Sequence, residues 1–373
     1  MDNTKKQLIP LRGKTTGAII GTGLVALDVV IPKGLEEDPQ LRGGGTCGNV
    51  LTALAYLGWQ SYPIARLSND GASRHVTADL KQWGVKLDLV SFDDDGSTPV
   101  IVQHIRNKDG VPTHSFSRKC PCCGAIMPWY KAIRVVDVET LTPKLPKYQV
   151  YFFDRTSRGA VTLAEKAMEN GALVFFEPSA SSEPRLLDEA LQLAHIVKLS
   201  SDRISGNEAV LASPYPKLII ETQGTSGLRF RFNGSTSNHG GAKKWHRMDA
   251  VPATVLKDSA GAGDWCTAGI IYMVGGQGAK GLESLTLNEV RKAVKVGQAM
   301  ATWACGFVGP RGGMYQCEPA VLQTRVLDLL DGRKELGLNT SVLAERSPQG
   351  HPFSCELCHT KSASPKRTSS KKR

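Results

Sequence analysis

The sequence predicts an α/β protein built around a mostly parallel β-sheet that helices cover on both faces. Short, continuously apolar runs alternate with helical patterns along most of the chain. These runs are too apolar to be strands with one face in water, which is typical of parallel sheets buried on both sides. Between residues 98 and 118 a hairpin pattern interrupts the rhythm. We therefore expect three layers, helix, sheet and helix, with a small accessory sheet.

The predicted elements follow one another in a regular order. The strand candidates are residues 18–24, 62–67, 85–90, 150–153, 173–176, 196–199 and 218–220. The helical patterns are residues 49–57, 76–83, 160–169 and 186–194. A strand, a helix and the next strand form a βαβ unit, which makes the two strands parallel.

The accessory sheet is predicted from two extended runs, residues 98–106 and 112–118. They flank Asn107-Lys-Asp-Gly110, and an Asp-Gly step between extended runs is a strong hairpin signal. We place one main domain at residues 18–345, after an N-terminal extension at residues 1–17. A C-terminal arm at residues 346–373 follows, because Pro, Gly, Ser and Lys dominate there.

The composition is that of an ordinary globular protein with a charged tail. Of the 373 residues, 41% are hydrophobic and 22% are charged, which suffices to bury a core. The formal net charge is +11, and six lysines and arginines without an acid lie between Thr360 and Arg373. We expect this tail to be disordered and solvated, and a contact with nucleic acid is the alternative.

The location of the protein is predicted from what the sequence lacks. The first residues do not contain a basic stretch followed by the apolar core of a secretion signal. Apolar runs also stay far below the roughly 20 residues that span a bilayer. We therefore expect a cytoplasmic protein with no membrane segment.

The nine cysteines include two closely spaced pairs. Cys120-Pro-Cys-Cys123-Gly resembles a zinc knuckle, and Cys355-Glu-Leu-Cys358 is a second Cys-x-x-Cys pair. Four thiolates can form a closed tetrahedral zinc site, which fits a structural role better than catalysis. We therefore expect a structural Zn²⁺ if the fold brings the pairs together.

Two alternatives to this ligand set remain open. Cys122 or His359 could replace one of the four cysteines as a ligand. The cysteines could also be a set of reduced thiols, which is the usual state in the cytosol.

The segment Asp258-Ser-Ala-Gly-Ala-Gly-Asp264 carries the strongest functional signal, because an apolar helical pattern follows it directly. Gly261 and Gly263 permit backbone conformations and close approaches that a side chain would block. The following helix would direct free N–H groups at this turn, and such a turn holds an anion. The carboxylate of Asp264 would then lie where it can accept a proton from a hydroxyl. The alternative is a tight turn in which Asp264 only caps the helix.

At two places the sequence resembles the ribokinase-like, or PfkB-type, carbohydrate kinases. Their C-terminal signature reads D-[ST]-x-G-A-G-D, which residues 258–264 match throughout. Their N-terminal signature appears at residues 43–58, with Gly44, Gly45, Asn49 and Gly58 in the family spacing. The resemblance covers roughly residues 18–344. It implies the three-layer ribokinase-like fold and ATP-dependent phosphorylation of a hydroxyl on a small sugar-like substrate.

The resemblance also implies roles for individual residues. Asp264 corresponds to the catalytic base, and the backbone of residues 260–263 corresponds to the anion hole, with Gly261, Ala262 and Gly263. Asp28, Gly44, Gly45 and Asn49 correspond to the substrate pocket, where fixed polar partners suit a sugar that presents several hydroxyls. Taken without the family, Asp28 would be interpreted as a turn residue and Asn49 as a helix cap.

The nucleotide side is implied by three further segments. Thr222-Gln-Gly-Thr-Ser-Gly227 resembles the T-x-G-x-x-G stretch of the family, in which Gly224 and Gly227 would admit the phosphates of ATP. A hairpin turn is the alternative. Gln298 corresponds to a position on the adenine side, and Lys198 can serve a phosphate.

The accessory sheet resembles the β-lid of the family, formed by residues 28–45 and 96–119, with the cysteine knuckle at 120–124 following it. Such a lid closes over the substrate and limits the hydrolysis of ATP. Its edges also suggest a homodimer.

One departure from the family concerns Mg²⁺. The family has an N-x-x-E stretch, linked to magnesium and phosphate, after the strand that residues 196–199 represent. Here the chain reads Ser200-Ser-Asp-Arg203, without the Asn or the Glu. Asp202 or Glu208 could contribute through water, because Mg²⁺ keeps several waters and few protein ligands.

Two rival functions remain open at this point. A nucleoside kinase of the same fold would differ only in its substrate. A regulator without catalysis would use the pocket as a sensor and the basic tail on nucleic acid, and it would show steep salt dependence of nucleic-acid binding without ATP turnover.

Overall fold

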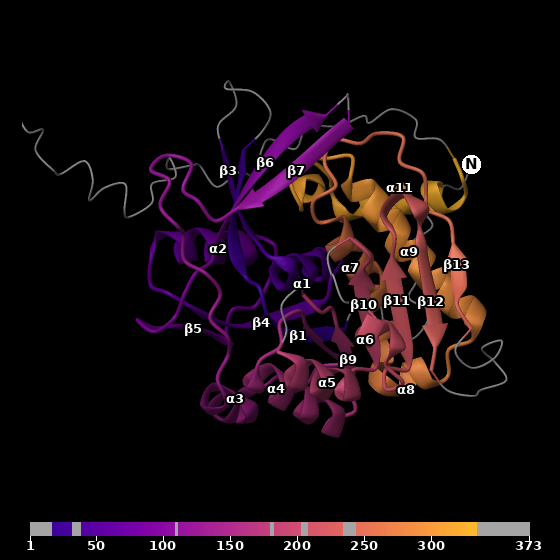
Figure 1. The fold of residues 1–373 in the computed structure, drawn as a ribbon, viewed down its shortest axis with the longest axis horizontal. Coiled ribbons are helices and arrows are strands. Elements are labelled where there is room, and N and C mark those ends of the chain that lie inside the picture. Colours follow the sequence, from indigo (N-terminus) through magenta and orange to yellow (C-terminus); the bar gives the residue numbers. More distant parts are fainter. Residues whose placement is uncertain are drawn as a thin grey trace, which may run out of the picture.

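The computed structural model describes residues 17–31, 39–108, 111–179, 183–202, 208–233 and 244–333. A nine-stranded sheet runs through the centre in the order β13-β12-β11-β10-β9-β8-β1-β4-β5, with helices on both sides of it (Figure 1). Its strands are β1 Ala18–Thr22, β4 Gln60–Leu67, β5 Val90–Phe92, β8 Val150–Phe153, β9 Leu173–Phe176, β10 Ile196–Ser200, β11 Leu218–Thr222, β12 Leu228–Phe232 and β13 His246–Met248. Neighbours from β5 to β11 pair in parallel, and β12 and β13 are added antiparallel at one edge. The predicted mostly parallel sheet is confirmed.

The strands are apolar throughout because both faces of the sheet are buried. On one face, Ile19, Phe152 and Phe175 pack with residues of the helices α1, α7 and α9 in one apolar core. On the other face, the next residues along the same strands, such as Phe153 and Phe176, pack with α4 and α5 in a second core. Side chains of a strand point alternately to the two faces, so both sets must be apolar.

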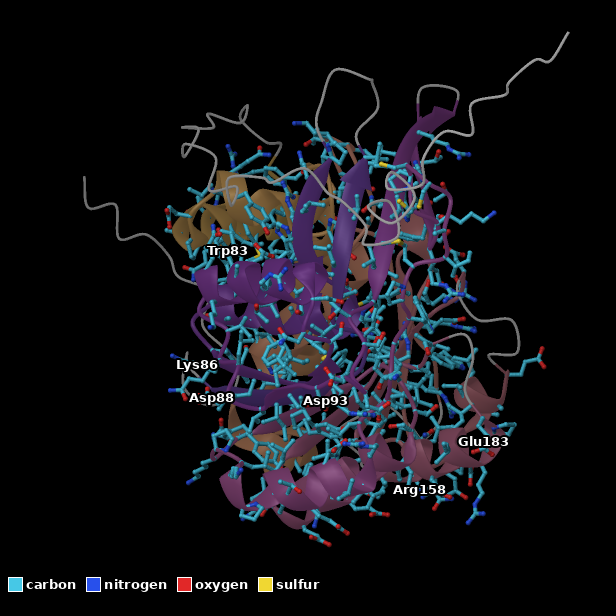
Figure 2. The ribbon with its side chains drawn as sticks, turned by 90° about the vertical axis from the view of Figure 1, so that its left-hand side faces the viewer. Trp83, Lys86, Asp88, Asp93, Arg158 and Glu183 are labelled. Carbon is cyan, nitrogen blue, oxygen red and sulfur yellow. The ribbon has the colours of Figure 1, made fainter. Side chains whose placement is uncertain are left out.

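The helices form the two outer layers. Figure 2 shows Arg158 and Glu183, which mark the starts of α4 and α5. The helices are α1 Thr46–Tyr56, α2 Gly71–Gln82, α3 Val135–Leu141, α4 Arg158–Glu169, α5 Pro184–Leu193, α6 Glu208–Ala212, α7 Ala262–Val274, α8 Gly278–Glu283, α9 Leu287–Ala304, α10 Gly312–Gln316 and α11 Pro319–Leu330.

A second sheet stands beside α2 at the upper side of Figure 1. It has the order β3-β2-β6-β7, with β2 Ala26–Ile31, β3 Gln40–Gly44, β6 Val100–Lys108 and β7 Val111–Ser117. The hairpin prediction is confirmed, since β6 and β7 pair antiparallel up to Lys108 opposite Val111. The residues predicted to form the lid therefore build one small sheet, and residues 32–38 lie outside the described part.

One predicted strand is shorter than expected. Residues 85–90 were predicted as a strand from their apolar character, but pairing with β4 begins only at Val90 opposite Ala65. Val85 instead donates its N–H to Leu80 at the end of α2. The side chains of Val85 and Leu89 are buried, although these residues form no ladder hydrogen bonds. Apolar character therefore predicts that a segment is buried, but it does not by itself predict that the segment pairs as a strand.

Several predictions fall on residues that the structure does not describe. These are most of the N-terminal extension, the end of the main domain from residue 334 to 345, and the C-terminal arm with Cys355, Cys358 and the basic tail. Within the described residues, no helix is long and apolar enough to cross a membrane.

A buried ion-pair network ties the small sheet to the C-terminal part of the chain. Asp79 on α2 accepts hydrogen bonds from the Gly43 N–H (2.7 Å), the Tyr315 hydroxyl (2.6 Å) and the Arg311 guanidinium. Arg311 also donates to the Gly43 carbonyl, and the side chains of Arg311 and Asp79 are each 1% exposed. Buried charges are tolerated only when they are paired and hydrogen-bonded, so each partner requires the other.

Replacement of Asp79 tests this network. Asp79→Ala should lower the free energy of unfolding by about 3–5 kcal/mol, because the Arg311 charge stays buried without its counter-charge. Urea denaturation measures the change. The control is Asp95→Ala, which removes a carboxylate that also pairs with Arg66 and Lys131 but is 67% exposed. An equal loss of stability in both variants would contradict the role of burial.

Candidate functional site

The loop before α7 makes a turn that only glycine allows. Gly261 has φ 76° at the N-terminus of α7, a left-handed conformation that is costly for other residues. A Cβ atom at this position would lie 2.6 Å from Pro310 Cα. The indole N–H of Trp265 donates to the Pro310 carbonyl (3.0 Å), so the same proline contacts both sides of the turn. The start of α7 is therefore fixed in position.

The backbone N–H groups of this turn divide into two sets. Ala260 donates to the Asp258 carboxylate (3.0 Å) and Ala262 to the Ser259 carbonyl (3.2 Å), so these two groups serve the turn itself. The helical ladder starts at Trp265, which donates to the Gly261 carbonyl. The amide of Gly263 belongs to the first turn of α7, where a helix offers N–H groups to an anion. The anion hole at residues 260–263 stays a prediction.

Asp264 and Asn49 meet in the interior of the protein. Asp264 lies in the first turn of α7 and Asn49 in α1, and these helices lie side by side (Figure 1). The Asn49 amide donates to Asp264 Oδ2 at 2.7 Å, and the two residues are only 5% and 4% exposed. In the part of the chain that the structure describes, Asn49 Oδ1 is buried and accepts no hydrogen bond. The structure therefore brings together a predicted catalytic residue and a predicted substrate residue.

A buried acid and base lie beside the same turn. Lys198 on β10 donates to Glu177 Oε1 at 2.7 Å, and Thr267 on α7 donates to Glu177 Oε2 at 2.6 Å. A Cβ atom on Gly263 would lie 3.9 Å from both Lys198 Nζ and Glu177 Oε1. The ammonium group of Lys198, the residue predicted to serve a phosphate, is therefore adjacent to the turn.

Glu177 and Thr267 were missed by the sequence analysis. Glu177 directly follows β9, and its backbone N–H donates to the carbonyl of Phe153 on the neighbouring strand. The carboxyl ends of parallel strands line the ligand sites of such sheets. An acidic residue immediately after a continuously apolar strand was the signal that could have identified it.

Asp28 lies on β2, a strand of the small sheet. A Cβ atom on Gly44 would lie 1.9 Å from its carboxylate, so the close approach of β3 requires glycine. Gly45 has φ 78°, precedes α1, and its N–H hydrogen-bonds the Asp28 carboxylate. Burial raises the pKa of Asp28 to about 7, although the nearby Arg311 charge and the Gly45 N–H act in the opposite direction. The protein therefore holds a protonatable carboxyl group at the position predicted to bind substrate.

Asp258, the first residue of the turn, joins the small sheet to the turn before α7. Its carboxylate accepts hydrogen bonds from Gln103 on β6 (2.6 Å), from the Gly309 N–H (3.0 Å) and from the Ala260 N–H, and His114 on β7 lies 3.3 Å away. Burial alone would raise the pKa of Asp258, but these four contacts outweigh burial and hold the pKa below its usual range. The small sheet is thereby attached to the turn.

Three of the residues predicted for the nucleotide, Thr222, Gly224 and Gly227, lie where β11 turns into β12. Gly224 (φ 55°) and Gly227 (φ 91°) form the turn between β11 and β12. A Cβ on Gly227 would lie 2.2 Å from the Met248 carbonyl, so packing against β13 already requires this glycine. Thr222 ends β11 and donates to the Leu199 carbonyl (3.3 Å). The backbone of this segment therefore forms a hairpin turn, which was the alternative to a stretch that admits phosphates.

Gln298 lies on α9 and is largely buried. Its amide donates to the Asp249 carbonyl at 3.2 Å. Its Oε1 atom is buried and has no hydrogen-bond partner among the described residues. This acceptor remains available to a ligand with an N–H or O–H group.

The predicted metal ligands are only partly described. Cys120 and Cys123 lie in a tight turn after β7, while Cys355 and Cys358 lie outside the described residues.

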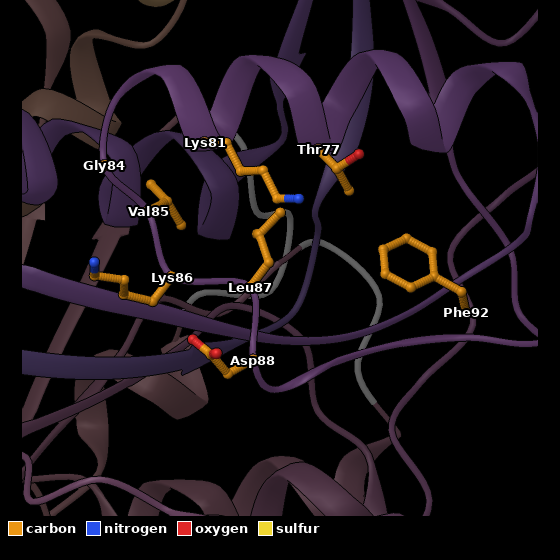
Figure 3. A pocket seen from close by; sticks show the side chains of 8 residues that line it. All are labelled: Thr77, Lys81, Gly84, Val85, Lys86, Leu87, Asp88 and Phe92. Atoms are coloured by element: carbon orange, nitrogen blue, oxygen red, sulfur yellow. The ribbon is translucent and has the colours of Figure 1, made fainter.

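A shallow groove at the end of α2 is separate from these residues. Figure 3 shows Thr77 and Lys81 extending from α2 toward Leu87. The groove has a volume of about 540 Å³, and none of its lining residues belongs to the site around Asp264.

Comparisons with known proteins agree with this arrangement. No family model matches the sequence. A curated fructokinase from Klebsiella pneumoniae is 26% identical over 252 residues, covering 61% of this chain and 75% of the relative. A fructokinase from Xylella fastidiosa with bound ATP superposes with a TM-score of 0.60 at 19% identity, over 84% of this chain and 98% of the other. The chain has the ribokinase-like fold.

Other proteins with the ribokinase-like fold are similar to the same extent. An aminoimidazole riboside kinase from Salmonella enterica, complexed with its riboside and an ATP analogue, gives a TM-score of 0.59 at 18% identity, over 83% of this chain and 99% of the other. A nucleoside kinase from Burkholderia thailandensis in complex with inosine gives 0.59 at 16% identity, over 85% and 100%. The two signature segments resemble these kinases in sequence, and the described chain resembles them in fold.

The raised pKa of Asp28 predicts a pH dependence of stability. The folded state favours the protonated carboxyl, so this contribution is complete below the ordinary aspartate pKa of about 4 and is lost as the pH rises toward 7. Asp28→Asn keeps a neutral side chain of similar shape. Its free energy of unfolding should therefore rise relative to the wild type between about pH 4 and pH 7. Urea denaturation across this range measures the difference, and a constant difference would contradict the raised pKa.

Proposed function

We propose that the protein is an ATP-dependent kinase that transfers the γ-phosphate to a hydroxyl of a small sugar or sugar-like substrate. The observation that carries the proposal is the position of Asp264, which is held by Asn49 at the amide-lined start of α7. The similarity to fructokinases and nucleoside kinases supports the reaction type.

The geometry is suited to phosphoryl transfer by proton removal and charge stabilisation. The substrate hydroxyl oxygen attacks the γ-phosphorus, its proton passes to Asp264, and the bond to the leaving ADP oxygen breaks. The backbone amides of the predicted anion hole, such as those of Gly261 and Gly263, would stabilise the negative charge on the transferred group. The Lys198 ammonium lies next to Gly263 and would neutralise further phosphate charge.

The substrate would lie between Asp28 and Asn49. Asn49 Oδ1 is a buried acceptor, and within the described chain no donor satisfies it, so a substrate hydroxyl is a suitable partner. Asp28 offers a second polar group, which is neutral or charged near pH 7. Two such fixed groups suit a ligand with several hydroxyls.

A nucleoside kinase is the second candidate. It is favoured by the structural likeness to an aminoimidazole riboside kinase and a nucleoside kinase. Both candidates use the same base and the same anion turn, so only the acceptor substrate separates them.

The site is suited to a Mg²⁺ ion that is bound to the protein through water molecules. The described residues contain no cluster of three or more potential metal ligands. Mg²⁺ needs few protein ligands, because phosphate oxygens and waters complete its shell. Glu177 is the buried carboxylate beside the turn and would hold the ion through water, while its pairing with Lys198 and Thr267 fixes its orientation. When bound, Mg²⁺ would supply charge neutralisation for the phosphates of ATP.

The small sheet would act as the lid over the substrate. Its attachment to Asp258 through Gln103 and His114 supports this role, since the lid then contacts the anion turn directly. The homodimer stays a prediction, for which β7 offers an edge strand with Phe116 51% exposed. A nucleic-acid contact of the basic tail also stays a prediction, because the tail lies outside the described residues.

Substitution of the base tests the proposal. Asp264→Asn should lower kcat by about 10²–10⁴-fold, because the amide cannot take the proton. The binding of ATP should change little, since the substitution leaves the backbone donors in place. Transfer of labelled phosphate from ATP to a panel of sugars and nucleosides measures kcat and identifies the acceptor class.

The control variant is Asp188→Asn, an exposed aspartate on α5 that should leave kcat unchanged. Full activity of Asp264→Asn, or no phosphate transfer by the wild type to any acceptor, would contradict the proposed reaction. Salt-dependent binding of nucleic acid without ATP turnover would instead favour a regulator.

A further inference from the structure

The strand order of the large sheet reverses between β8 and β1. From β1 the chain continues outward to β4 and β5, and it later returns to β8 and continues through β9 and β10 in the other direction. Sheets of this kind bind ligands at the carboxyl ends of the strands that flank such a switch point. Arg155 follows the end of β8 by two residues, so it lies at this position.

The guanidinium group of Arg155 is held by one of its nitrogen atoms. Nη1 donates to the Asp154 carboxylate at 2.6 Å and to the Asp154 carbonyl at 2.9 Å. Among the described residues, no hydrogen bond is made by its Nε or Nη2 atom. An arginine side chain carries five N–H donors in a fixed plane. The Arg155 side chain, which is 20% exposed, is therefore oriented by Asp154 and keeps donors for a ligand.

Asp154 is a positioning residue for Arg155. Its carboxylate is 1% exposed, and Oδ1 accepts the Leu24 N–H at 2.9 Å while Oδ2 pairs with Arg155. A Cβ atom on Gly23 would lie 1.7 Å from Oδ1, so the chain after β1 approaches this carboxylate closely only with glycine. Both oxygens of Asp154 are thus occupied by the protein.

Leu24 connects this arginine to the site around Asn49. Its N–H is bound by Asp154, and its carbonyl accepts the N–H of Gly48 at 3.2 Å. Gly48 directly precedes Asn49 on α1. The end of β8 and the start of α1 are therefore joined through one backbone unit.

The buried thiol of Cys47, also on α1, indicates the same proximity. Burial is the main cause that raises its pKa, and the charges of Asp154, Arg155 and Asp264 all act on it as well. Arg155 and the proposed catalytic base therefore lie around the same buried group.

Tyr130 offers a second donor at this position. Its hydroxyl is buried, and no residue in the described part of the chain is its hydrogen-bond partner. Burial raises the pKa of Tyr130, the Asp154 charge adds to the rise, and the Arg155 charge opposes it. The hydroxyl is therefore close to both charged groups and stays protonated at neutral pH. A buried hydroxyl without a partner is rare in proteins, and an acceptor on a ligand would satisfy it.

We propose that Arg155 and Tyr130 bind a carboxylate of the acceptor substrate, so that the substrate is a sugar acid and not a neutral sugar. This inference rests on the proposed kinase function and specifies the class of its acceptor. The parallel N–H groups of a guanidinium match a planar carboxylate. A phosphate dianion fits less well, because Asp154 already places one negative charge beside Arg155. The carboxylate would hold one end of the substrate while a hydroxyl faces Asp264.

A matched substrate panel tests the proposal. Gluconate is compared with sorbitol and sorbitol 6-phosphate, and galacturonate with galactose and galactose 6-phosphate. Transfer of labelled phosphate from ATP to each compound gives kcat and KM. For the wild type, kcat/KM of the better acid should exceed that of its neutral counterpart by about 10–100-fold, because charge-assisted hydrogen bonds are made only to the acid.

Variants assign this preference to the two residues. Arg155→Gln should remove the preference for the acid, mainly by raising its KM, and should leave kcat for the neutral counterpart unchanged. Tyr130→Phe should reduce the preference by about 2–10-fold, because one neutral hydrogen bond is lost. Arg158→Gln is the matched control, since it removes an arginine that is 49% exposed and pairs with Glu189, and it should keep the preference.

The outcomes separate this inference from the kinase function. Equal kcat/KM for acids and neutral sugars, a preference for the phosphate esters, or an unchanged preference in Arg155→Gln would overturn the carboxylate site and leave the kinase function intact. Calorimetric titration of gluconate and galacturonate without ATP gives the other separation. Binding that Arg155→Gln abolishes, without any phosphate transfer, would support the carboxylate site and contradict the kinase. The wild-type comparison needs no variant, so it decides the question even if a variant fails to fold.

Discussion

The packing of Gly261 against Pro310 fixes the chain at the point where α7 begins, and the positions of the other site residues depend on it. A side chain at residue 261 would collide with the proline backbone, so the loop can approach this closely only with glycine. Trp265 secures the same contact from the helix side through its hydrogen bond to Pro310. Asp264 lies between these two anchors and has little freedom to turn away from Asn49.

The first aspartate of the turn has a different role from the last. Asp258 carries its negative charge among several donors, and two of these donors come from the small sheet. The other acid of the pocket, Asp28, is held by burial in a state that favours the proton. Two carboxyl groups near one site therefore have opposite pKa shifts, because one is surrounded by hydrogen-bond donors and the other is mainly desolvated. This contrast arises from the environment and not from the residue type.

Sequence patterns predicted those features that are encoded locally. The glycine turn, the Asp-Gly hairpin and the alternation of strands and helices each depend on neighbouring residues, and each appears in the structure. Glu177 and the Arg311–Asp79 pair could not be predicted in this way, because buried ion pairs join residues far apart in the sequence. The predicted length of β5 was wrong for a related reason, since a strand needs a neighbouring strand to pair with as well as apolar residues. The Gly44 and Gly45 positions were predicted by resemblance alone, and their close contacts with Asp28 and Leu24 give the physical reason.

The order of the elements along the chain has a consequence for biosynthesis. The face of the large sheet that carries Phe152 and Phe175 is covered by α1 and by α7 and α9, and the last two come from a much later part of the sequence. A growing chain on the ribosome therefore completes all the strands of this sheet, from β1 to β13, before α7 and α9 exist. During that interval the apolar surface that α7 and α9 will cover is open to water and to other chains, which favours aggregation unless a chaperone shields it. Slower translation between residues 222 and 262 would lengthen the exposure and should lower the yield of folded protein.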